Sequence, residues 1–409
     1  MYIFKAGVVG AGAMGAEIAQ VISYSGLPVV LKDVDQRMLD KGLAHIREIY
    51  QRRVDKGKMS ASDMDSKVSL ITPTLTYDDF GDVDLVIEAV PEQMTIKRAV
   101  LAELARVLPE SAIVASNTSA LSISEMGAAF GRPSKMVGMH FFNPASVMKL
   151  VEVIPGLDTS QETVDDVVAF AESLRKLPVV VKECPGFLVN RLLMPYLNEA
   201  VLALESGAAS AAEIDQRMQA WGWPMGPFLL MDMLGLDVCA HVGQYLESEY
   251  GERMKGARLF PLLLQAGRLG EKSGAGFFGY GGETDEPVKK MIADLQASGQ
   301  VTPDPGGFSE DRLVLPLINE AALCLQENIA SPGDIDMAMV AGSGMTYQGE
   351  RMGPLAVADT LGLDVVLEKL EGLHKTYGER FRPARYLKMK VRAGHLGKKT
   401  GRGFHEYSA

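Results

Sequence analysis

Short apolar runs alternate with longer, more polar stretches from the N-terminus to residue 183. The apolar runs, rich in valine and isoleucine, predict strands, and the stretches between them predict helices. The predicted strands cover residues 5–9, 29–33, 84–90, 112–116, 136–140, 149–153 and 179–182, and the first two predicted helices cover 14–25 and 36–56. This alternation is typical of a parallel sheet covered by helices, so we expect an α/β domain here.

The pattern becomes helical after residue 183. Between residues 187 and 204, apolar side chains recur at intervals of three and four, as on one face of a helix. They are Val189, Leu192, Leu193, Tyr196, Leu197, Ala200, Val201 and Leu204. The remaining chain is helical in pattern, with Gly and Pro between segments, so we expect a mainly α region from residue 184.

This helical region contains an internal repeat. The sequence RLLMPYLNEA at 191–200 returns as RLVLPLINEA at 312–321, so the shift from 191 to 312 is 121 residues. Gly270 and Gly397 match later at a shift of 127, which places six inserted residues in the second copy. Ordered recurrence of this kind indicates duplication. We predict a Rossmann-type α/β domain at 1–183, then two tandem, homologous, mainly α-helical domains at 184–282 and 310–409, joined by a linker at 283–309 with one short helix.

Charge and cysteine content narrow the classes of function. The chain has 409 residues and a formal net charge of −11, which argues against nucleic acid or an anionic membrane as the main partner. No uncharged apolar stretch approaches the roughly 18 residues that span a bilayer, so we expect no membrane insertion. The three cysteines form no CxxC pair and no metal-ligand cluster with the six histidines. We therefore expect a cytoplasmic protein without a metal.

A glycine-rich motif follows the first predicted strand. Residues 10–15 read GAGAMG, a GxGxxG pattern that is weak alone, because 42 glycines occur in the chain and these three could serve packing only. Its place between a strand and a helix, with Asp33 ending the second strand, is the context of a dinucleotide site. An aspartate there accepts hydrogen bonds from ribose hydroxyls and repels a 2′-phosphate. We therefore predict NAD as the cofactor, bound at Gly10, Gly12, Ala13, Met14, Gly15 and Asp33.

His140 is the one histidine in a chemically suggestive setting. It closes a predicted strand and precedes Phe-Phe-Asn-Pro, a turn that would place it at the carboxyl edge of the sheet, where ligands bind. If the turn reverses the chain, Glu152 meets His140 across neighbouring strands. A carboxylate on one imidazole nitrogen fixes the tautomer and leaves the other nitrogen as a base. A hydrogen-bonded core histidine and a salt-bridged strand glutamate are the structural alternatives.

Six motifs together resemble the signature of the L-3-hydroxyacyl-CoA dehydrogenase family. They are GAGAMG, Asp33, SNTS at 116–119, HFFNP at 140–144, VMKLVEV at 147–153 and PGFLVNR at 185–191. The likeness runs over essentially the whole chain, and the duplicated helical region is most similar to the dehydrogenase half of the multifunctional fatty-acid β-oxidation α subunit. We expect the hydratase half of that subunit to be absent, because residue 1 lies only a few residues before the first strand.

The resemblance implies roles for individual residues. His140 matches the catalytic base that takes the proton of the 3-hydroxyl group, and Glu152 matches its carboxylate partner. Further cofactor contacts are implied at Val90, Glu92, Lys97, Ser119, Asn143 and Lys272, and substrate contacts at Ser119 and Asn190. Ser119 could instead cap a helix, and Asn190 could be an exposed helix residue.

The nucleotide end of an acyl-CoA needs cations. Five basic residues lie towards the end of the long predicted helix, where family members place CoA-binding residues: Arg47, Arg52, Arg53, Lys56 and Lys58. We choose Lys56, although a solvated helix face is the usual explanation of such a run.

The second helical copy is expected to be structural, because Asp311 stands where the first copy has Asn190. We hypothesise that it packs on the first copy as an intrachain pseudo-dimer, and a homodimer is the other arrangement. A separate hydratase or thiolase is a further partner that the resemblance implies.

The expected function is NAD-dependent oxidation of (S)-3-hydroxyacyl-CoA to 3-oxoacyl-CoA in fatty-acid β-oxidation. One alternative is a 3-hydroxybutyryl-CoA dehydrogenase of butanoate metabolism. The other is a non-catalytic nucleotide-binding member of the fold, since fold alone does not establish function.

Overall fold

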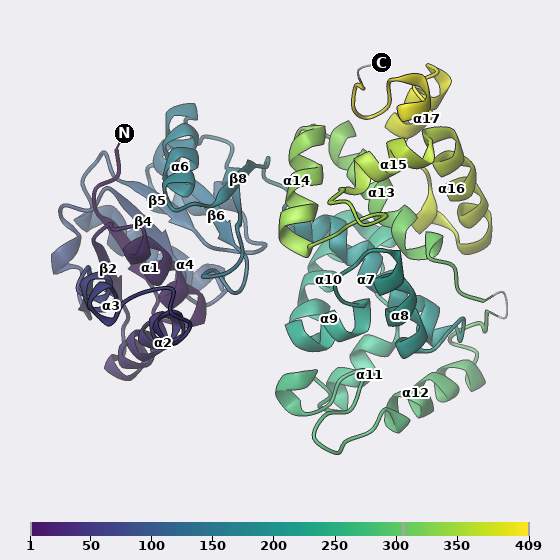
Figure 1. The fold of residues 1–409 in the computed structure, drawn as a ribbon, viewed down its shortest axis with the longest axis horizontal. Coiled ribbons are helices and arrows are strands. Elements are labelled where there is room, and N and C mark those ends of the chain that lie inside the picture. Colours follow the sequence, from purple (N-terminus) through teal and green to yellow (C-terminus); the bar gives the residue numbers. More distant parts are fainter. Residues whose placement is uncertain (1, 305–306, 408–409) are drawn as a thin grey trace. The chain divides into compact units, whose positions relative to one another are not determined.

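The computed structural model describes residues 2–304 and 307–407. The chain divides into two compact units, one that ends at Phe187 and one that begins at Leu188 (Figure 1). The first unit contains the sheet, and the second is helical.

The first unit is built on one eight-stranded sheet with the order β3-β2-β1-β4-β5-β6-β7-β8. Its strands are β1 (Ala6–Val9), β2 (Val29–Lys32), β3 (Ile71–Thr74), β4 (Leu85–Glu88), β5 (Ile113–Ser116), β6 (Met136–Phe141), β7 (Leu150–Pro155) and β8 (Leu177–Val180). All neighbours are parallel except β6 and β7, which are antiparallel. The predicted α/β class is therefore confirmed, and the sheet is mixed rather than wholly parallel.

The two edge strands were predicted less well than the inner strands. Strand β3 was not predicted, because it contains Pro73 and three of its four residues are not buried, so it lacks an apolar run. Strand β8 begins two residues earlier than predicted and includes Pro178, which an edge strand tolerates because one side of it forms no ladder. The inner strands β1, β4 and β5 are buried at every position, which is why their apolar runs were readable.

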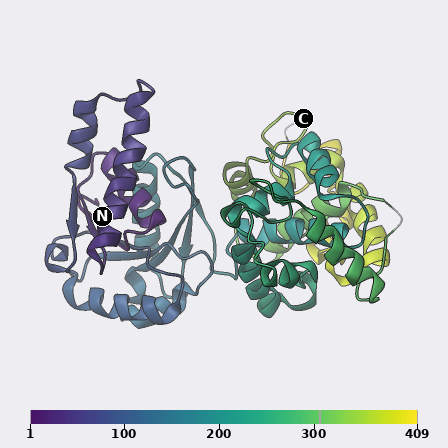
Figure 2. The same ribbon diagram turned by 90° about the horizontal axis from the view of Figure 1, so that it is seen from below.

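Six helices accompany the sheet: α1 (Ala13–Tyr24), α2 (Gln36–Asp55), α3 (Ala61–Val68), α4 (Met94–Val107), α5 (Ile123–Phe130) and α6 (Gln161–Ser173). The two helices predicted by range, at 14–25 and 36–56, agree with α1 and α2 to within one residue at each end. Asp35 is the N-cap residue of α2, because its side chain accepts hydrogen bonds from the backbone N–H groups of Arg37 and Met38. Helices α2 and α3 lie side by side (Figure 2).

The second unit contains helices α7 to α17. They are α7 (Val189–Glu205), α8 (Ala211–Trp221), α9 (Pro227–Leu234), α10 (Leu236–Tyr250), α11 (Leu259–Gln265), α12 (Glu286–Ala297), α13 (Asp311–Gln326), α14 (Pro332–Ser343), α15 (Pro354–Leu361), α16 (Leu363–Tyr377) and α17 (Arg385–Arg392). Both ends of α16 follow those of α10 at the predicted shift of 127 residues. The repeat therefore extends to helix boundaries, while the predicted division into two domains with a linker at 283–309 stays a prediction.

Helices α7 and α13, which are equivalent in the two copies, pack against each other through reciprocal ion pairs. Arg191 Nε lies 2.8 Å from Glu320 Oε1, and the equivalent Arg312 Nε lies 2.6 Å from Glu199 Oε1. All four side chains are buried. A contact in which residue i meets j and j meets i is the geometry of a two-fold interface. The reciprocal pairs fit the expected pseudo-dimer of the two copies, and that they take the place of two subunits stays a prediction.

A buried carboxyl group on α7 makes the stability of this unit depend on pH. Burial raises the pKa of Glu205 from 4.5 to about 7. The folded state therefore holds this proton more tightly, so the contribution of Glu205 to stability is most favourable below pH 4.5, becomes less favourable as the pH rises to about 7 and changes no further above that. We expect Glu205→Gln to raise the free energy of unfolding at pH 8 by about 1–3 kcal/mol and to change it little at pH 4.5. Urea denaturation followed by fluorescence measures this, because both tryptophans, Trp221 and Trp223, lie in this unit.

Candidate active site

The glycine turn between β1 and α1 is shaped by contacts that exclude side chains. Gly10 has φ +104°, and a Cβ atom there would lie 2.5 Å from the carbonyl oxygen of Ala89. A Cβ atom at Gly15 would lie 1.8 Å from the carbonyl oxygen of Gly10. Asp33 holds the same turn, since its Oδ2 accepts a hydrogen bond of 2.7 Å from the backbone N–H of Ala11. The fold therefore requires glycine at two of the three motif positions.

Gly12 is different from the other two glycines of the motif. A Cβ atom at Gly12 would meet no protein atom within 4 Å, and its φ of −63° suits any residue. It precedes Ala13 and Met14, the first residues of α1, and no side chain caps that helix. Open space and uncapped N–H groups at a helix N-terminus suit a pyrophosphate, and Asp33 follows at the end of the next strand. These residues therefore fit a dinucleotide.

We expect Gly12→Val to weaken NAD binding at least tenfold and to change the stability little, because the Cβ atom of the new side chain meets no protein atom within 4 Å. Isothermal titration with NAD and urea denaturation followed by circular dichroism measure the two effects. Gly81→Val is the matched control, since a Cβ atom at Gly81 also meets nothing within 4 Å. Equal NAD affinity in both variants would remove Gly12 from the cofactor site.

His140 and Glu152 lie opposite each other on the antiparallel strands β6 and β7. His140 Nδ1 is 2.7 Å from Glu152 Oε2, and both residues are buried. The expectation that the turn brings these two side chains together is confirmed. With Nδ1–H donating to the carboxylate, the lone pair of the neutral ring is on Nε2. The rings of Phe142 and Phe187 pack beside the imidazole, with centroids 4.6 and 6.0 Å away.

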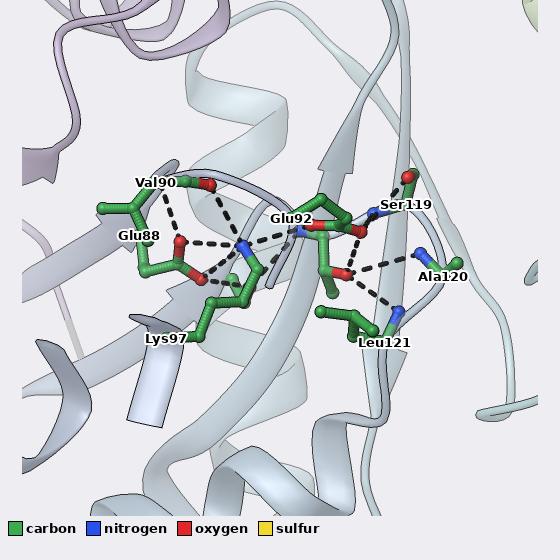
Figure 3. A network of polar contacts seen from close by, with 9 residues as sticks. Glu88, Val90, Glu92, Lys97, Ser119, Ala120 and Leu121 are labelled. Carbon is green, nitrogen blue, oxygen red and sulfur yellow. Dashed lines mark hydrogen bonds and ion pairs between the residues drawn. The ribbon is translucent and has the colours of Figure 1, made fainter. Parts of the chain in front are cut away.

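A second polar network links β4, α4 and the loop after β5 (Figure 3). Lys97 Nζ donates to Glu88 Oε1 at 2.8 Å and forms an ion pair of 3.2 Å with Glu92. Glu92 Oε1 in turn accepts from the backbone N–H of Ser119 at 2.8 Å and from its hydroxyl at 3.2 Å. Glu88 also accepts from the backbone N–H of Val90. The network therefore connects four residues that the sequence nominated, namely Val90, Glu92, Lys97 and Ser119.

The charge of Glu92 depends on its neighbours in this network. Burial alone would raise the pKa of Glu92, but the Lys97 ammonium and the donors Thr118 and Ser119 outweigh it and lower that pKa. Glu92 is therefore a carboxylate at neutral pH.

Ser119 does not cap the following helix, because Ser122 is the N-cap of α5 and accepts from the N–H of Glu125. The capping alternative for Ser119 is thus wrong.

The loop between β6 and β7 carries Asn143, which is exposed, and is held from two sides. Lys176 Nζ donates to the carbonyl oxygens of Ala145 and Met148 at 2.5 and 2.7 Å. Glu17 of α1 accepts from the backbone N–H of Ser146 at 3.0 Å. The loop after His140 is therefore tied to the helix of the glycine motif. Neither Lys176 nor Glu17 was predicted, because each contact joins segments far apart in sequence.

The basic residues proposed for CoA lie at the end of α2. Lys56 is the C-cap residue of α2 and is exposed, as are Arg47, Arg52 and Lys58. Arg53 instead packs over the ring of Tyr24. The structure therefore gives these cations the setting of a solvated helix end, and a CoA role for Lys56 stays a prediction.

Two nominated residues belong to the second unit. Asn190 is the second residue of α7, and Lys272 Nζ forms an ion pair of 2.6 Å with Asp237. The equivalent Lys399 pairs with Asp364 at 2.5 Å in the second copy, which no Rossmann unit precedes. The lysine–aspartate pair is thus a property of the repeated fold, and a cofactor role for Lys272 stays a prediction.

Two features of the described residues bear on metals and membranes. Within residues 2–304 and 307–407, no three His, Cys, Asp or Glu side chains gather as a metal site would need. Among the helices of that same part of the chain, none has the length and apolar character to cross a membrane.

Comparisons with known proteins agree along the chain. The family described as "3-hydroxyacyl-CoA dehydrogenase, NAD binding domain" matches residues 5–184, and "3-hydroxyacyl-CoA dehydrogenase, C-terminal domain" matches 186–280 and 307–407. The fatty acid oxidation complex subunit alpha of Psychrobacter arcticus is 41% identical over 391 residues, which are 92% of this chain and 54% of that protein. The chain thus spans about half the length of the curated relatives it matches.

Solved structures of two dehydrogenases are also similar to this chain. The 3-hydroxybutyryl-CoA dehydrogenase of Escherichia coli K12 is similar with a TM-score of 0.86 and 30% identity, over 96% of this chain and 99% of that one. The (S)-3-hydroxybutyryl-CoA dehydrogenase of Ralstonia eutropha is 40% identical, with a TM-score of 0.67, over 68% of this chain and 99% of that one.

Proposed function

Because the chain belongs to the 3-hydroxyacyl-CoA dehydrogenase family, we propose that it oxidises (S)-3-hydroxyacyl-CoA thioesters to 3-oxoacyl-CoA with NAD. The observation that carries this proposal is the buried pair of His140 and Glu152, since an alcohol can lose hydride only as its proton is removed. A place in fatty-acid β-oxidation follows from the α-subunit relatives and is part of the same proposal.

The two residues of the pair have separate tasks. His140 Nε2 accepts the proton of the 3-hydroxyl group while hydride leaves C3, the carbon that carries this hydroxyl. NAD, when bound, would supply the hydride acceptor. Glu152 orients the ring through Nδ1 and stabilises the imidazolium that forms. A general base of this kind contributes a factor of about 10² to 10⁴ in rate. Burial strengthens the interaction with Glu152, because little water screens it.

Further polar residues would fix the reactants. We assign Ser119 and Asn190 to the substrate's hydroxyl and thioester oxygens, and Asp33 to the adenosine ribose. Glu92, Lys97 and Asn143 would position the nicotinamide end, and Lys56 would meet the CoA phosphates. Fixed donors around a developing charge lower the barrier more than mobile water does. The small-molecule partner in this proposal is an acyl-CoA. We further propose a hydratase or thiolase as the protein partner and the cytoplasm as the location.

The test is the absorbance of NADH after the enzyme is mixed with NAD and 3-hydroxyacyl-CoAs of four to sixteen carbons. We expect turnover with NAD and at least tenfold less with NADP, because Asp33 repels the 2′-phosphate. Turnover of the four-carbon substrate alone would favour a 3-hydroxybutyryl-CoA dehydrogenase, which the Escherichia coli structure makes the second candidate. NAD binding without turnover of any substrate would leave a nucleotide-binding protein.

A further inference from the structure

A groove with a basic wall lies within the second unit and is lined by residues of both helical copies. Its volume is about 620 Å³, which is in the range of small-molecule sites. The chain as a whole has a net charge of −11, but five side chains of this wall are basic and only three are acidic. We call this site the basic groove, after its cations Arg253, Arg380, Arg382, Arg385 and Lys388.

The acidic side chains of the basic groove are neutralised by cations that they contact. They lie on α13 and on two short helical turns, η3 (Gly251–Met254) and η5 (Glu379–Phe381). None of the three carboxylates is therefore left with an uncompensated charge that would repel an anion. The ion pairs are those of Glu320 with Arg253 at 3.1 Å, of Glu379 with Arg382 at 2.6 Å and of Glu252 with Lys255 at 2.9 Å.

Two cations of the basic groove, Arg385 and Lys388, have no such partner. Throughout residues 2–304 and 307–407, neither side chain forms an ion pair or a hydrogen bond. Arg253 also has a buried Nε–H group without a hydrogen-bond partner in that part of the chain. Positive charges in a recess raise the local concentration of anions, and a guanidinium group can bind a phosphate through two parallel hydrogen bonds.

Helix α13 fixes the segment that carries the two unpaired cations. Asn319 Nδ2 donates to the carbonyl oxygen of Arg382 at 3.0 Å, and its Oδ1 accepts from the N–H of Ala384 at 2.7 Å. Gln326 Oε1 accepts from the N–H of Tyr386 at 3.1 Å. The backbone at residues 382–386 is therefore held at three points, so less freedom is lost when its side chains bind a ligand.

The first copy has different residues at two of the equivalent positions. At the shifts of 121 and 127 residues, Gln326 and Lys388 correspond to Glu205 and Pro261. The second copy thus has one acid fewer and one base more at this place. The repeat does not need a base at position 388 to fold, because the first copy forms the equivalent helix α11 with Pro261. The added positive charge is better explained by binding than by folding.

We propose that the basic groove binds the diphosphate group of a phosphorylated small molecule. Two unpaired cations call for a ligand with at least two negative charges, and a diphosphate carries them on neighbouring groups. The site lies wholly within the second unit, whereas the glycine turn that fits the dinucleotide lies in the first. The inference therefore does not depend on the proposed function.

The experiment measures urea denaturation of the full chain by tryptophan fluorescence at increasing concentrations of inorganic pyrophosphate or ADP. Fluorescence reports the second unit, because both tryptophans lie there, so a ligand at the glycine turn does not contribute. Sodium chloride at matched ionic strength corrects for salt effects. We expect pyrophosphate to move the urea midpoint upward, and the dependence on its concentration gives the apparent Kd.

Two double variants locate the site. In Arg385→Gln/Lys388→Gln we expect the apparent Kd for pyrophosphate to rise at least tenfold, with Lys388→Gln alone between this variant and wild type. Lys375→Gln/Arg392→Gln is the matched control, because it removes the same charge from exposed residues outside the groove and should keep the wild-type Kd.

The other outcomes are equally definite. A wild-type midpoint that moves no further with pyrophosphate than with sodium chloride overturns the proposal. Equal losses of affinity in the two double variants also overturn it, because they would show a general effect of charge. If ADP binds more tightly than pyrophosphate at this site, the ligand is a nucleotide, and the reverse order identifies a free diphosphate.

Discussion

Replacing His140 with glutamine is expected to lower kcat by a factor of about 10² to 10⁴ and to leave NAD affinity near that of the wild type. Glutamine keeps a polar group of similar size but cannot accept the proton of the alcohol. The imidazole contacts Glu152 and two aromatic rings, whereas the glycine turn that fits the dinucleotide belongs to β1 and α1. Initial rates from NADH absorbance and titration with NAD measure the two quantities.

A second variant makes this test sharper. Glu152→Gln is the companion variant, because it keeps the base but removes the charge that stabilises imidazolium. Undiminished turnover in His140→Gln would exclude His140 as the base.

The second large effect is expected from Lys97→Met, which should destabilise the first unit by about 3–5 kcal/mol. Glu88 is 0% exposed and Lys97 is 1% exposed, so removal of the ammonium leaves a buried carboxylate without its counter-charge. Urea denaturation followed by circular dichroism should show an earlier transition. Fluorescence should not, because both tryptophans lie in the second unit.

The double variant Glu88→Gln/Lys97→Met is the control for this interpretation. It removes both charges, so the carboxylate penalty disappears and much of the stability should return. Additive losses in the double variant would show that the two side chains contribute independently, and the coupling inferred from their 2.8 Å contact would be wrong.

Local patterns predicted the elements whose residues are buried in a regular order. The inner strands are apolar throughout, and α1 and α2 have clear ends, so their ranges were readable. The meeting of His140 and Glu152 was also predictable, because a turn of known length fixes the register between neighbouring strands. Edge strand β3 was not, since it is short and mostly exposed.

The polar networks of the site were predictable only in part. Glu92, Lys97 and Ser119 were nominated through a family resemblance, but Glu88, the buried partner of Lys97, was read as one more strand residue. A charged residue in the apolar run LVIEAV was the available signal, because a buried carboxylate requires a partner. Lys176 gave no such signal, since its acceptors are backbone carbonyl groups 28 and 31 residues away.

The reciprocal pairs of Arg191 with Glu320 and of Arg312 with Glu199 constrain how this chain can be recombined. If α7 alone were replaced by a helix that lacks these residues, a guanidinium or a carboxylate of α13 would stay buried without its partner, at a penalty of several kcal/mol. Chimaeras should therefore exchange both helices together.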